Sequence, residues 1–252
     1  MTHKPTLEPH LDITKVGNVS YYHRLTQGSD EWLDLRKGML TASTMKLALS
    51  EKTLKIANND KIRQQIYQLA AERIGCPSGD NFVSYAMERG NLEEVEARIA
   101  YSAAFEPVAE CGYVINDKLG FPIGWSPDGL VGNDGGTESK SRMPKYQVQT
   151  ICEHYGEHEN TPIPSEFMLQ VQTGLFVSER KWIDFLSYSN GMNMAPIRCF
   201  PIAKYQEAIE LAAIETEKGI DRVVAKYMSV VDVPDNRITP VKFVDYNEEI
   251  TA

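Results

Sequence analysis

The stretch from Trp125 to Lys140 constrains the fold more than any other part of the sequence. It reads Trp-Ser-Pro-Asp-Gly-Leu-Val-Gly-Asn-Asp-Gly-Gly-Thr-Glu-Ser-Lys. The Gly, Asn and Asp residues at 132–136 predict a tight turn between two strands, at 129–131 and 137–141. Side chains alternate along a strand, so Glu138 and Lys140 point to one face and Ser139 to the other. The turn brings Asp128 back toward this face.

This arrangement of charges suits a divalent cation. Mg²⁺ prefers hard oxygen ligands and keeps several waters. Asp128, Glu138 and the backbone carbonyl of Ser139 supply such ligands, and Lys140 stands beside them. A bound metal activates water and neutralises phosphate charge, while a lysine orients the water or stabilises the developing charge. The pattern therefore favours metal-dependent phosphate chemistry, and an ordinary Asp-Gly turn beside an exposed charged pair is the alternative reading.

The remaining sequence predicts an α/β fold with a central mixed β-sheet flanked by helices. Apolar spacing and turn residues delimit the elements. Expected helices are 31–50 in two pieces, 60–75, 85–104, 166–177 and 203–227, and expected strands are 112–115, 123–126, 129–131, 137–141, 181–189 and 198–202. Residues 144–164 are expected to be a loop or partly helical. We predict a single domain over 1–252, with its core at about 28–227 and a peripheral tail at 233–252.

Composition excludes several classes of protein. The formal net charge is −9, which argues against a protein that coats nucleic acid through clustered Lys and Arg. No apolar run approaches the roughly 20 residues that a membrane helix needs. The first residues lack the apolar core of a secretory signal, so a cytoplasmic location is expected. The four cysteines form no CxxC pair, which argues against a disulfide framework, a zinc cluster or an iron–sulfur cluster.

Four ordered blocks resemble the lambda exonuclease and YqaJ-type viral recombinase family of PD-(D/E)xK nucleases. Residues 28–43 resemble its W-x3-R-x-G-x2-T-A-S block, and residues 88–94 resemble its G-x3-E helix. Residues 127–140 read PD-x9-ExK, and residues 170–172 read Gln-Val-Gln. Four motifs in the same order are far more specific than any one alone. The resemblance implies a restriction-endonuclease-like nuclease core.

The resemblance also implies catalytic roles. Asp128 and Glu138 would hold the catalytic metal, and Glu94 would reach a second metal or its waters from the helix at 85–104. Lys140 would assist the nucleophilic water. Gln170 would contact the phosphate or brace the site.

The resemblance also implies how the substrate is recognised. Arg36, Ser43 and Ser126 would form a pocket for a terminal 5′-phosphate, since Arg binds phosphate through two donors and Ser adds neutral hydrogen bonds. Such a pocket would hold the end of a strand and favour ends over internal sites.

The implied function is a Mg²⁺-dependent exonuclease with two metal ions per site, Mn²⁺ being an alternative. It would degrade linear double-stranded DNA 5′ to 3′ from phosphorylated ends. The biological setting would be phage-type recombination by single-strand annealing, encoded by a phage or prophage in the cytoplasm of a bacterial host. The resemblance further implies a homotrimeric ring around DNA and a single-strand annealing partner protein.

Several alternatives stay open. The chain could be an endonuclease, or a DNA-end-binding module with little catalysis. Glu93 could take the role of Glu94, and Gln172 could take that of Gln170. Neighbouring positions on a helix face different ways, so only one residue of each pair can face the site. Phe167 stands where the family has Tyr, and Ser141-Arg142 replaces apolar or Cys residues, which bears on substrate preference. Residues 154–158 match the zinc-peptidase pattern H-x-x-E-H, but Gly156 makes the required helix unfavourable.

Overall fold

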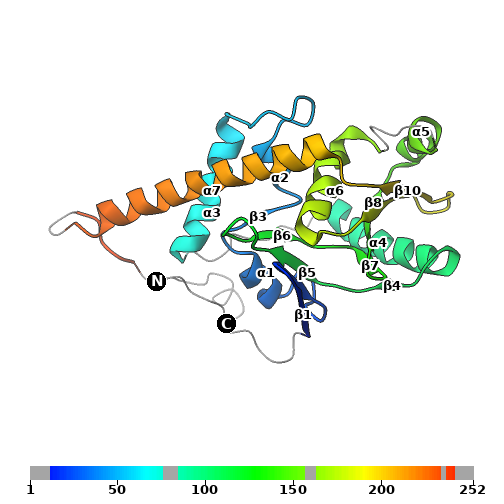
Figure 1. The fold of residues 1–252 in the computed structure, drawn as a ribbon, viewed down its shortest axis with the longest axis horizontal. Helices are drawn as coiled ribbons and strands as arrows, with labels where there is room; N and C mark the ends of the chain where they lie inside the picture. Colours follow the sequence, from blue (N-terminus) through cyan, green and yellow to red (C-terminus); the bar gives the residue numbers. More distant parts are fainter. Residues whose placement is uncertain (1–11, 76–84, 157–162, 234–236, 242–252) are drawn as a thin grey trace.

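The computed structural model of the chain describes residues 12–75, 85–156, 163–233 and 237–241 (Figure 1). Its strands form two five-stranded mixed sheets. The strand order in the first sheet is β1 (Ile13–Val16), β2 (Val19–Tyr22), β5 (Tyr113–Asn116), β6 (Ile123–Trp125), β3 (Leu40–Thr41). The strand order in the second sheet is β10 (Ala195–Cys199), β9 (Trp182–Tyr188), β8 (Gly135–Ser141), β7 (Gly129–Val131), β4 (Val108–Ala109). The predicted α/β class is confirmed, and its strands divide between two sheets.

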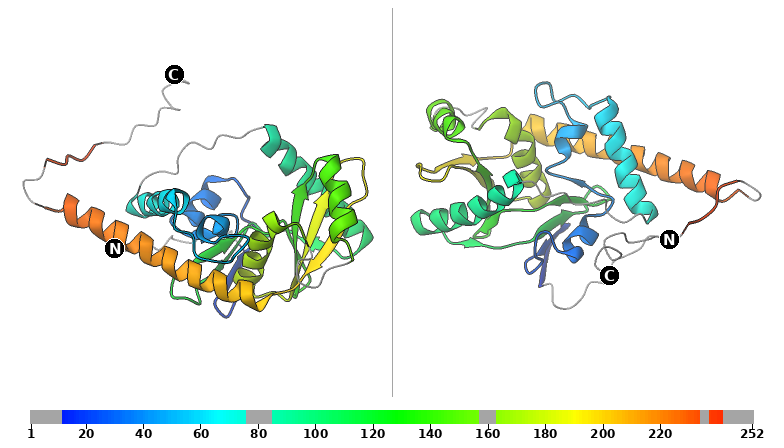
Figure 2. Two further views of the ribbon diagram at one scale, coloured as in Figure 1. Left: turned by 90° about the horizontal axis from the view of Figure 1, so that it is seen from above. Right: turned by 180° about the vertical axis from the view of Figure 1, so that it is seen from behind.

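Helices cover both sheets. They are α1 (Asp30–Arg36), α2 (Met45–Ala48), α3 (Asp60–Ile74), α4 (Tyr85–Ala104), α5 (Pro144–His154), α6 (Ser165–Ser178) and α7 (Ala203–Val231). α6 packs on β5 and β6 of the first sheet and on β9 of the second, while α4 packs on β8 and β9 (Figure 2). Within the described ranges, no helix is long and apolar enough to cross a bilayer.

The two faces of the second sheet can be followed along β9, where successive side chains alternate. Asp184 faces α4, since its carboxylate accepts a hydrogen bond from Tyr101 at 2.6 Å. Phe185 faces α6, where its ring lies 5.2 Å from that of Phe167. Glu138 pairs with Phe185 across the parallel β8–β9 ladder and so shares the α6 face. The second sheet is therefore enclosed between α4 and α6.

The predicted strand at 198–202 is displaced toward the N-terminus, to Ala195–Cys199. Pro201 has no backbone N–H and cannot continue a ladder, so the strand ends before it. Residues 144–164 begin with a helix, because Pro144 at its first position has the φ angle that a helix needs. The predicted helices at 60–75 and 85–104 are confirmed as α3 and α4.

The core between the sheets fixes one wall of the site. Trp125, at the end of β6, is 1% exposed and packs against α6. Gly174 makes this contact possible, because a Cβ there would lie 2.9 Å from the indole ring. The indole Nε1 then donates a hydrogen bond to Glu138 at 3.2 Å. A close helix–strand contact in the core thus orients a charged side chain of the second sheet.

On the α4 face, a buried acid is neutralised by one arginine. Asp184 is 4% exposed, and its two oxygens accept hydrogen bonds from Arg198 Nε and Nη2 at 2.8 and 2.9 Å. The Arg198 guanidinium also lies 3.6 Å from the centroid of the Trp182 ring. Hydrogen bonding to Asp184 raises the pKa of Arg198, despite the opposing effect of burial. The pair joins β9 to β10 and stabilises the sheet.

Arg198→Ala is expected to lower the free energy of unfolding by about 2–4 kcal/mol, because it leaves a buried carboxylate without its cation. Urea denaturation measures this loss. Lys181→Ala is the matched control, since Lys181 and Asp134 form an exposed pair at 2.8 Å, and such pairs contribute about 0–1 kcal/mol. An equal effect of both substitutions would contradict the assigned role of Arg198.

Candidate active site

The β7–β8 hairpin brings Asp128 beside the returning strand. Gly129 pairs with Thr137, so the residue before β7 lies next to the middle of β8. One carboxylate oxygen of Asp128 accepts a hydrogen bond from the backbone N–H of Ser139. The turn between the strands includes Gly132 with a φ of +49°, a conformation that favours glycine. The hairpin therefore holds Asp128 against the strand that carries the other charged residues.

Glu138 is the centre of the cluster and is only 1% exposed. Its Oε1 accepts hydrogen bonds from Lys140 Nζ at 2.6 Å and from Gln170 Nε2 at 2.5 Å. Its Oε2 accepts the bond from Trp125 Nε1. β8, β6 and α6 therefore all contribute a group that fixes this carboxylate.

Excess negative charge defines the electrostatics of the cluster. Burial raises the pKa of Asp128 well above its ordinary value, and Glu138 and Glu94 raise it further. Burial also raises the pKa of Glu94, with a further contribution from Glu138. Burial alone would lower the pKa of Lys140, but Glu138, Asp128 and Glu94 outweigh it, so that this pKa is raised. Lys140 is therefore held as a cation among three carboxylates.

The donor set fits a divalent cation. Asp128, Glu138 and Glu94 offer hard oxygen atoms in a buried place, and the single ammonium of Lys140 leaves a net negative charge there. The carbonyl of Ser139 lies between Glu138 and Lys140 on β8 and is the further oxygen expected from the sequence. Within the described ranges, no three acidic, His or Cys side chains already stand at ligating spacing. Protein donors instead bond to one oxygen of Asp128 and to both oxygens of Glu138.

The structure separates the neighbouring candidates on α4 and α6. Glu94 interacts electrostatically with Glu138 and Lys140, whereas one oxygen of Glu93 is buried without a hydrogen-bond partner. Gln170 bonds to Glu138, whereas Gln172 donates to Phe200 O at 2.8 Å. The side chain of Gln172 is therefore part of the contact between α6 and the β10–α7 segment.

A hollow of about 380 Å³ opens beside the cluster. Ser43 lines it together with Lys140 and Gln170. The other lining residues are Ala42, Lys46, Glu51, Glu166 and Phe167. The structure thus brings Ser43, from the first sequence block, to the same place as the residues of the third and fourth blocks.

Arg36 lies in an adjacent but separate hollow of about 230 Å³, where Thr41 also forms part of the wall. Its guanidinium lies 3.9 Å from the centroid of the Trp32 ring, and its Nε is buried without a hydrogen-bond partner. Thr41 Oγ1 is 3.1 Å from Ser43 Oγ, so one residue links the two hollows. Ser126 is half-buried beside Pro127 and lines neither hollow.

Sequence reasoning missed Trp125, Phe167 and Lys46 as parts of this site. Trp125 donates to Glu138, the Phe167 ring lies 6.0 Å from Lys140 Nζ, and Lys46 lines the hollow. Trp125 carried a signal in the sequence as the residue that ends the strand before Asp128, and Phe167 carried one as the residue that replaces the Tyr of the family. The zinc-peptidase pattern fails at its start, because α5 ends at His154 and Tyr155 is extended. His158 lies outside the described residues.

Comparison with known proteins identifies the family. Residues 31–181 match the model of the YqaJ-like viral recombinase domain, and the chain belongs to this family. The structure is similar to that of an alkaline exonuclease from Laribacter hongkongensis, with a TM-score of 0.61, 25% identity, and coverage of 80% of this chain and 99% of that chain. The predicted resemblance is confirmed.

Two further structures are similar. The same Laribacter hongkongensis exonuclease in complex with dAMP gives a TM-score of 0.62 at 25% identity, again over 80% of this chain and 99% of that chain. A phage-related exonuclease from Haemophilus somnus 129PT gives 0.51 at 10% identity, over 75% of this chain and 96% of that chain, which supports the fold alone. No curated protein matches the sequence.

Proposed function

We propose that this chain is a Mg²⁺-dependent deoxyribonuclease that degrades linear double-stranded DNA from its ends, 5′ to 3′, during recombination by single-strand annealing. One observation carries the proposal: Asp128, Glu138 and Glu94 gather around Lys140 beside an open hollow. The family and its exonuclease neighbours support DNA as the substrate. Buried like charges of this kind are costly for folding and gather at sites of chemistry.

The residues divide the chemistry between them. Asp128, Glu138 and the Ser139 carbonyl would hold Mg²⁺ or Mn²⁺, and Glu94 would hold the waters of a second ion; the metal supplies an activated water and neutralises phosphate charge. Lys140 Nζ, fixed by Glu138 at 2.6 Å, is placed to orient the attacking water and donate to the developing oxyanion. Gln170 holds Glu138 in position and faces the hollow that would receive the scissile phosphate.

Recognition of an end is assigned to Arg36, Ser43 and Ser126. The unpartnered buried Nε of Arg36 is a donor that a phosphate would satisfy. Ser43 faces the catalytic hollow, and Thr41 joins the two hollows. A 5′-phosphate seated between Arg36 and Ser43 would hold the terminal nucleotide next to Lys140, and Ser126 would approach it from the β6–β7 connection.

The assembly and its partners are proposals from the family likeness. We propose a homotrimeric ring that encloses the DNA, a single-strand annealing protein as partner, and a phage or prophage origin in a bacterial cytoplasm. Sedimentation tests the ring directly, and a monomer at micromolar concentration would contradict it.

The function is tested with three DNA substrates in the presence and absence of Mg²⁺. Linear duplex with 5′-phosphates should be degraded only with the metal, while covalently closed circular duplex should remain intact. Linear duplex with blocked 5′ ends should be degraded slowly. Cutting of the circle would instead indicate an endonuclease, and binding to ends without cutting would indicate a docking module.

Arg36→Lys is expected to remove most of the preference for 5′-phosphorylated over 5′-hydroxyl ends, while the maximal rate changes little. Lysine keeps the charge but loses the planar pair of donors that fits a phosphate. The measurement is kcat/KM on the two kinds of end, with Arg63→Lys as a matched exposed control. An unchanged preference would show that Arg36 does not bind the terminal phosphate.

A further inference from the structure

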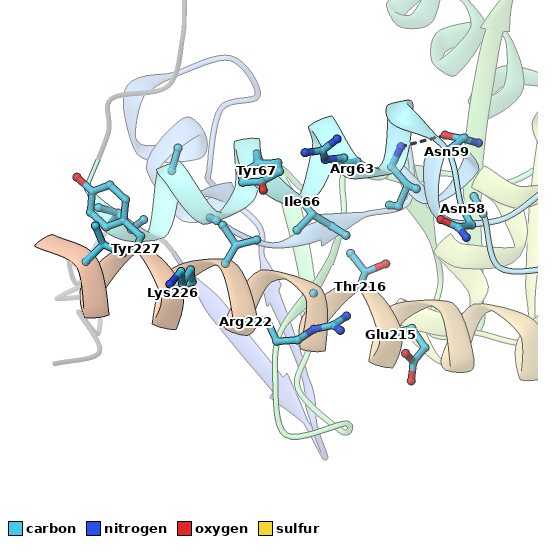
Figure 3. A pocket seen from close by; sticks show the side chains of 18 of the residues that line it. Asn58, Asn59, Arg63, Ile66, Tyr67, Glu215, Thr216, Arg222, Lys226 and Tyr227 are labelled. Atoms are coloured by element: carbon cyan, nitrogen blue, oxygen red, sulfur yellow. Dashed lines mark hydrogen bonds between the residues drawn. The ribbon is translucent and has the colours of Figure 1, made fainter.

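An apolar groove of about 1090 Å³ lies between α3 and α7, and none of its lining residues belongs to the carboxylate cluster. Asn58 and Asn59 mark one end and Tyr227 the other, with Ile66 projecting from α3 toward α7 (Figure 3). Gly219 allows this approach, since a Cβ there would lie 2.8 Å from Ile66 Cδ1. The two helices therefore meet in the floor of the groove and leave its upper part open.

Large apolar side chains on the walls of the groove remain exposed. Tyr67 of α3 is 52% exposed and Tyr227 of α7 is 47% exposed, and Ile56 and Val230 are exposed as well. A continuous apolar surface of this kind usually serves to bind something. The open groove is therefore a candidate binding surface.

The charge of the groove is opposite to that of the whole protein. Among the described residues that line it, Arg63, Arg222 and Lys226 are cationic and Glu215 is the one acid, although the chain carries a net charge of −9. Glu215 forms its ion pair with Lys218 at 2.7 Å and interacts more weakly with Arg222, so the three cations form no ion pair of their own in the described part of the chain. The groove thus favours an occupant that is both apolar and acidic.

The chain itself contains such a segment. Residues 242–252 read Lys-Phe-Val-Asp-Tyr-Asn-Glu-Glu-Ile-Thr-Ala, so apolar and acidic residues are interspersed along it. Ile238, a few residues earlier, already lines the groove. We propose that residues 242–252 occupy the α3–α7 groove of their own chain, with Phe243, Tyr246 and Ile250 on its apolar walls and Asp245, Glu248 and Glu249 beside its cations.

Length and tethering support this occupant over a separate protein. Eleven extended residues reach about 36 Å, whereas a helix of the length of α3 spans about 22 Å. A tethered segment also acts at an effective concentration in the millimolar range, which a free partner rarely reaches. The segment would cover the outer side of α3 and α7, which Arg73 and Glu217 already join at 2.7 Å. This inference does not depend on the proposed nuclease activity.

Hydrogen exchange on the full chain tests the proposal. Phe243→Ser combined with Tyr246→Ser should speed exchange of the α3 and α7 amides that face the groove by about tenfold, because local protection follows burial. The matched control, Asn247→Ser combined with Thr251→Ser, changes the same segment without removing apolar contacts and should leave exchange unchanged.

Charge reversal gives a second readout. Arg222→Glu with Lys226→Glu should speed hydrogen exchange of the same α3 and α7 amides. Adding Glu248→Lys with Glu249→Lys should restore their protection. The proposal is overturned if neither set of variants alters exchange on α3 and α7. It is also overturned if protection rises with protein concentration, because the occupant would then be the segment of a second copy.

Discussion

Lys140→Ala is expected to reduce hydrolysis of linear duplex DNA by about 100- to 1,000-fold, the effect typical of losing one pre-positioned donor to a developing charge. Among the residues that the structure describes, Lys140 is the cation that pairs with Glu138, at 2.6 Å, and it also offsets the charges of Asp128 and Glu94. Its loss removes the proposed donor to the reacting phosphate and the cation that offsets the charges of Glu138, Asp128 and Glu94.

The rate constant is measured under single-turnover conditions at saturating Mg²⁺. Lys46→Ala is the informative comparison, because Lys46 lines the same hollow but, within the described residues, does not bond to Glu138 as Lys140 does, and it should affect DNA affinity more than the chemical step. Circular dichroism and thermal unfolding check that the Lys140 variant is folded. A folded Lys140→Ala protein with wild-type turnover would remove Lys140 from the proposed mechanism.

Divalent metal should stabilise the protein markedly. At a Mg²⁺ concentration of 100 times Kd, linkage adds about 2.7 kcal/mol, which corresponds to an increase in Tm of about 5–10 °C for a chain of this size. Asp128→Asn combined with Glu138→Gln keeps the shape of the site and should abolish the increase. A surface pair, Asp34→Asn with Asp221→Asn, is the control and should respond to Mg²⁺ like the wild type. Equal stabilisation of all three proteins would place metal binding elsewhere.

The pH dependence of this stabilisation has a defined sign. The pKa values of Asp128 and Glu94 are raised in the folded protein, so without metal their contribution to stability is present at low pH and is lost as pH rises through the raised values. A metal ion competes with these protons. The Tm increase from Mg²⁺ should therefore grow with pH over this range. An increase that shrinks with pH would contradict the assignment of these carboxylates as the ligands.

The hairpin and the major helices were predictable because their signals are local. Turn residues at 132–136 and alternation along 137–141 sufficed to place Glu138 and Lys140 on one face. The division into two sheets was not predictable in this way. It depends on the parallel pairing of β3 with β6, which joins residues far apart in sequence and leaves no periodic pattern.

The side chains that support the site were also not predictable from the sequence. Trp125 looked like a core residue, and its hydrogen bond to Glu138 depends on the close approach of Gly174 from another helix. Glu94 stood within an acidic run that reads as a solvated helix face, and only the packing of α4 on β8 distinguishes it from Glu93. The resemblance to the family pointed to Glu94 but not to Trp125, and the contacts of both residues arise only in the tertiary structure.

The parallel pairing of β8 with β9 has a consequence for synthesis of the chain. Between these neighbouring strands the polypeptide passes through α5 and α6 before it re-enters the sheet at Trp182. Asp128 and Glu138 leave the ribosome well before Gln170 and β9, which enclose them. Chains that terminate before α6 therefore lack Gln170 and β9, which hold and cover Glu138 in the proposed active site. The proposed hydrolysis therefore requires a chain that has been synthesised at least through β9.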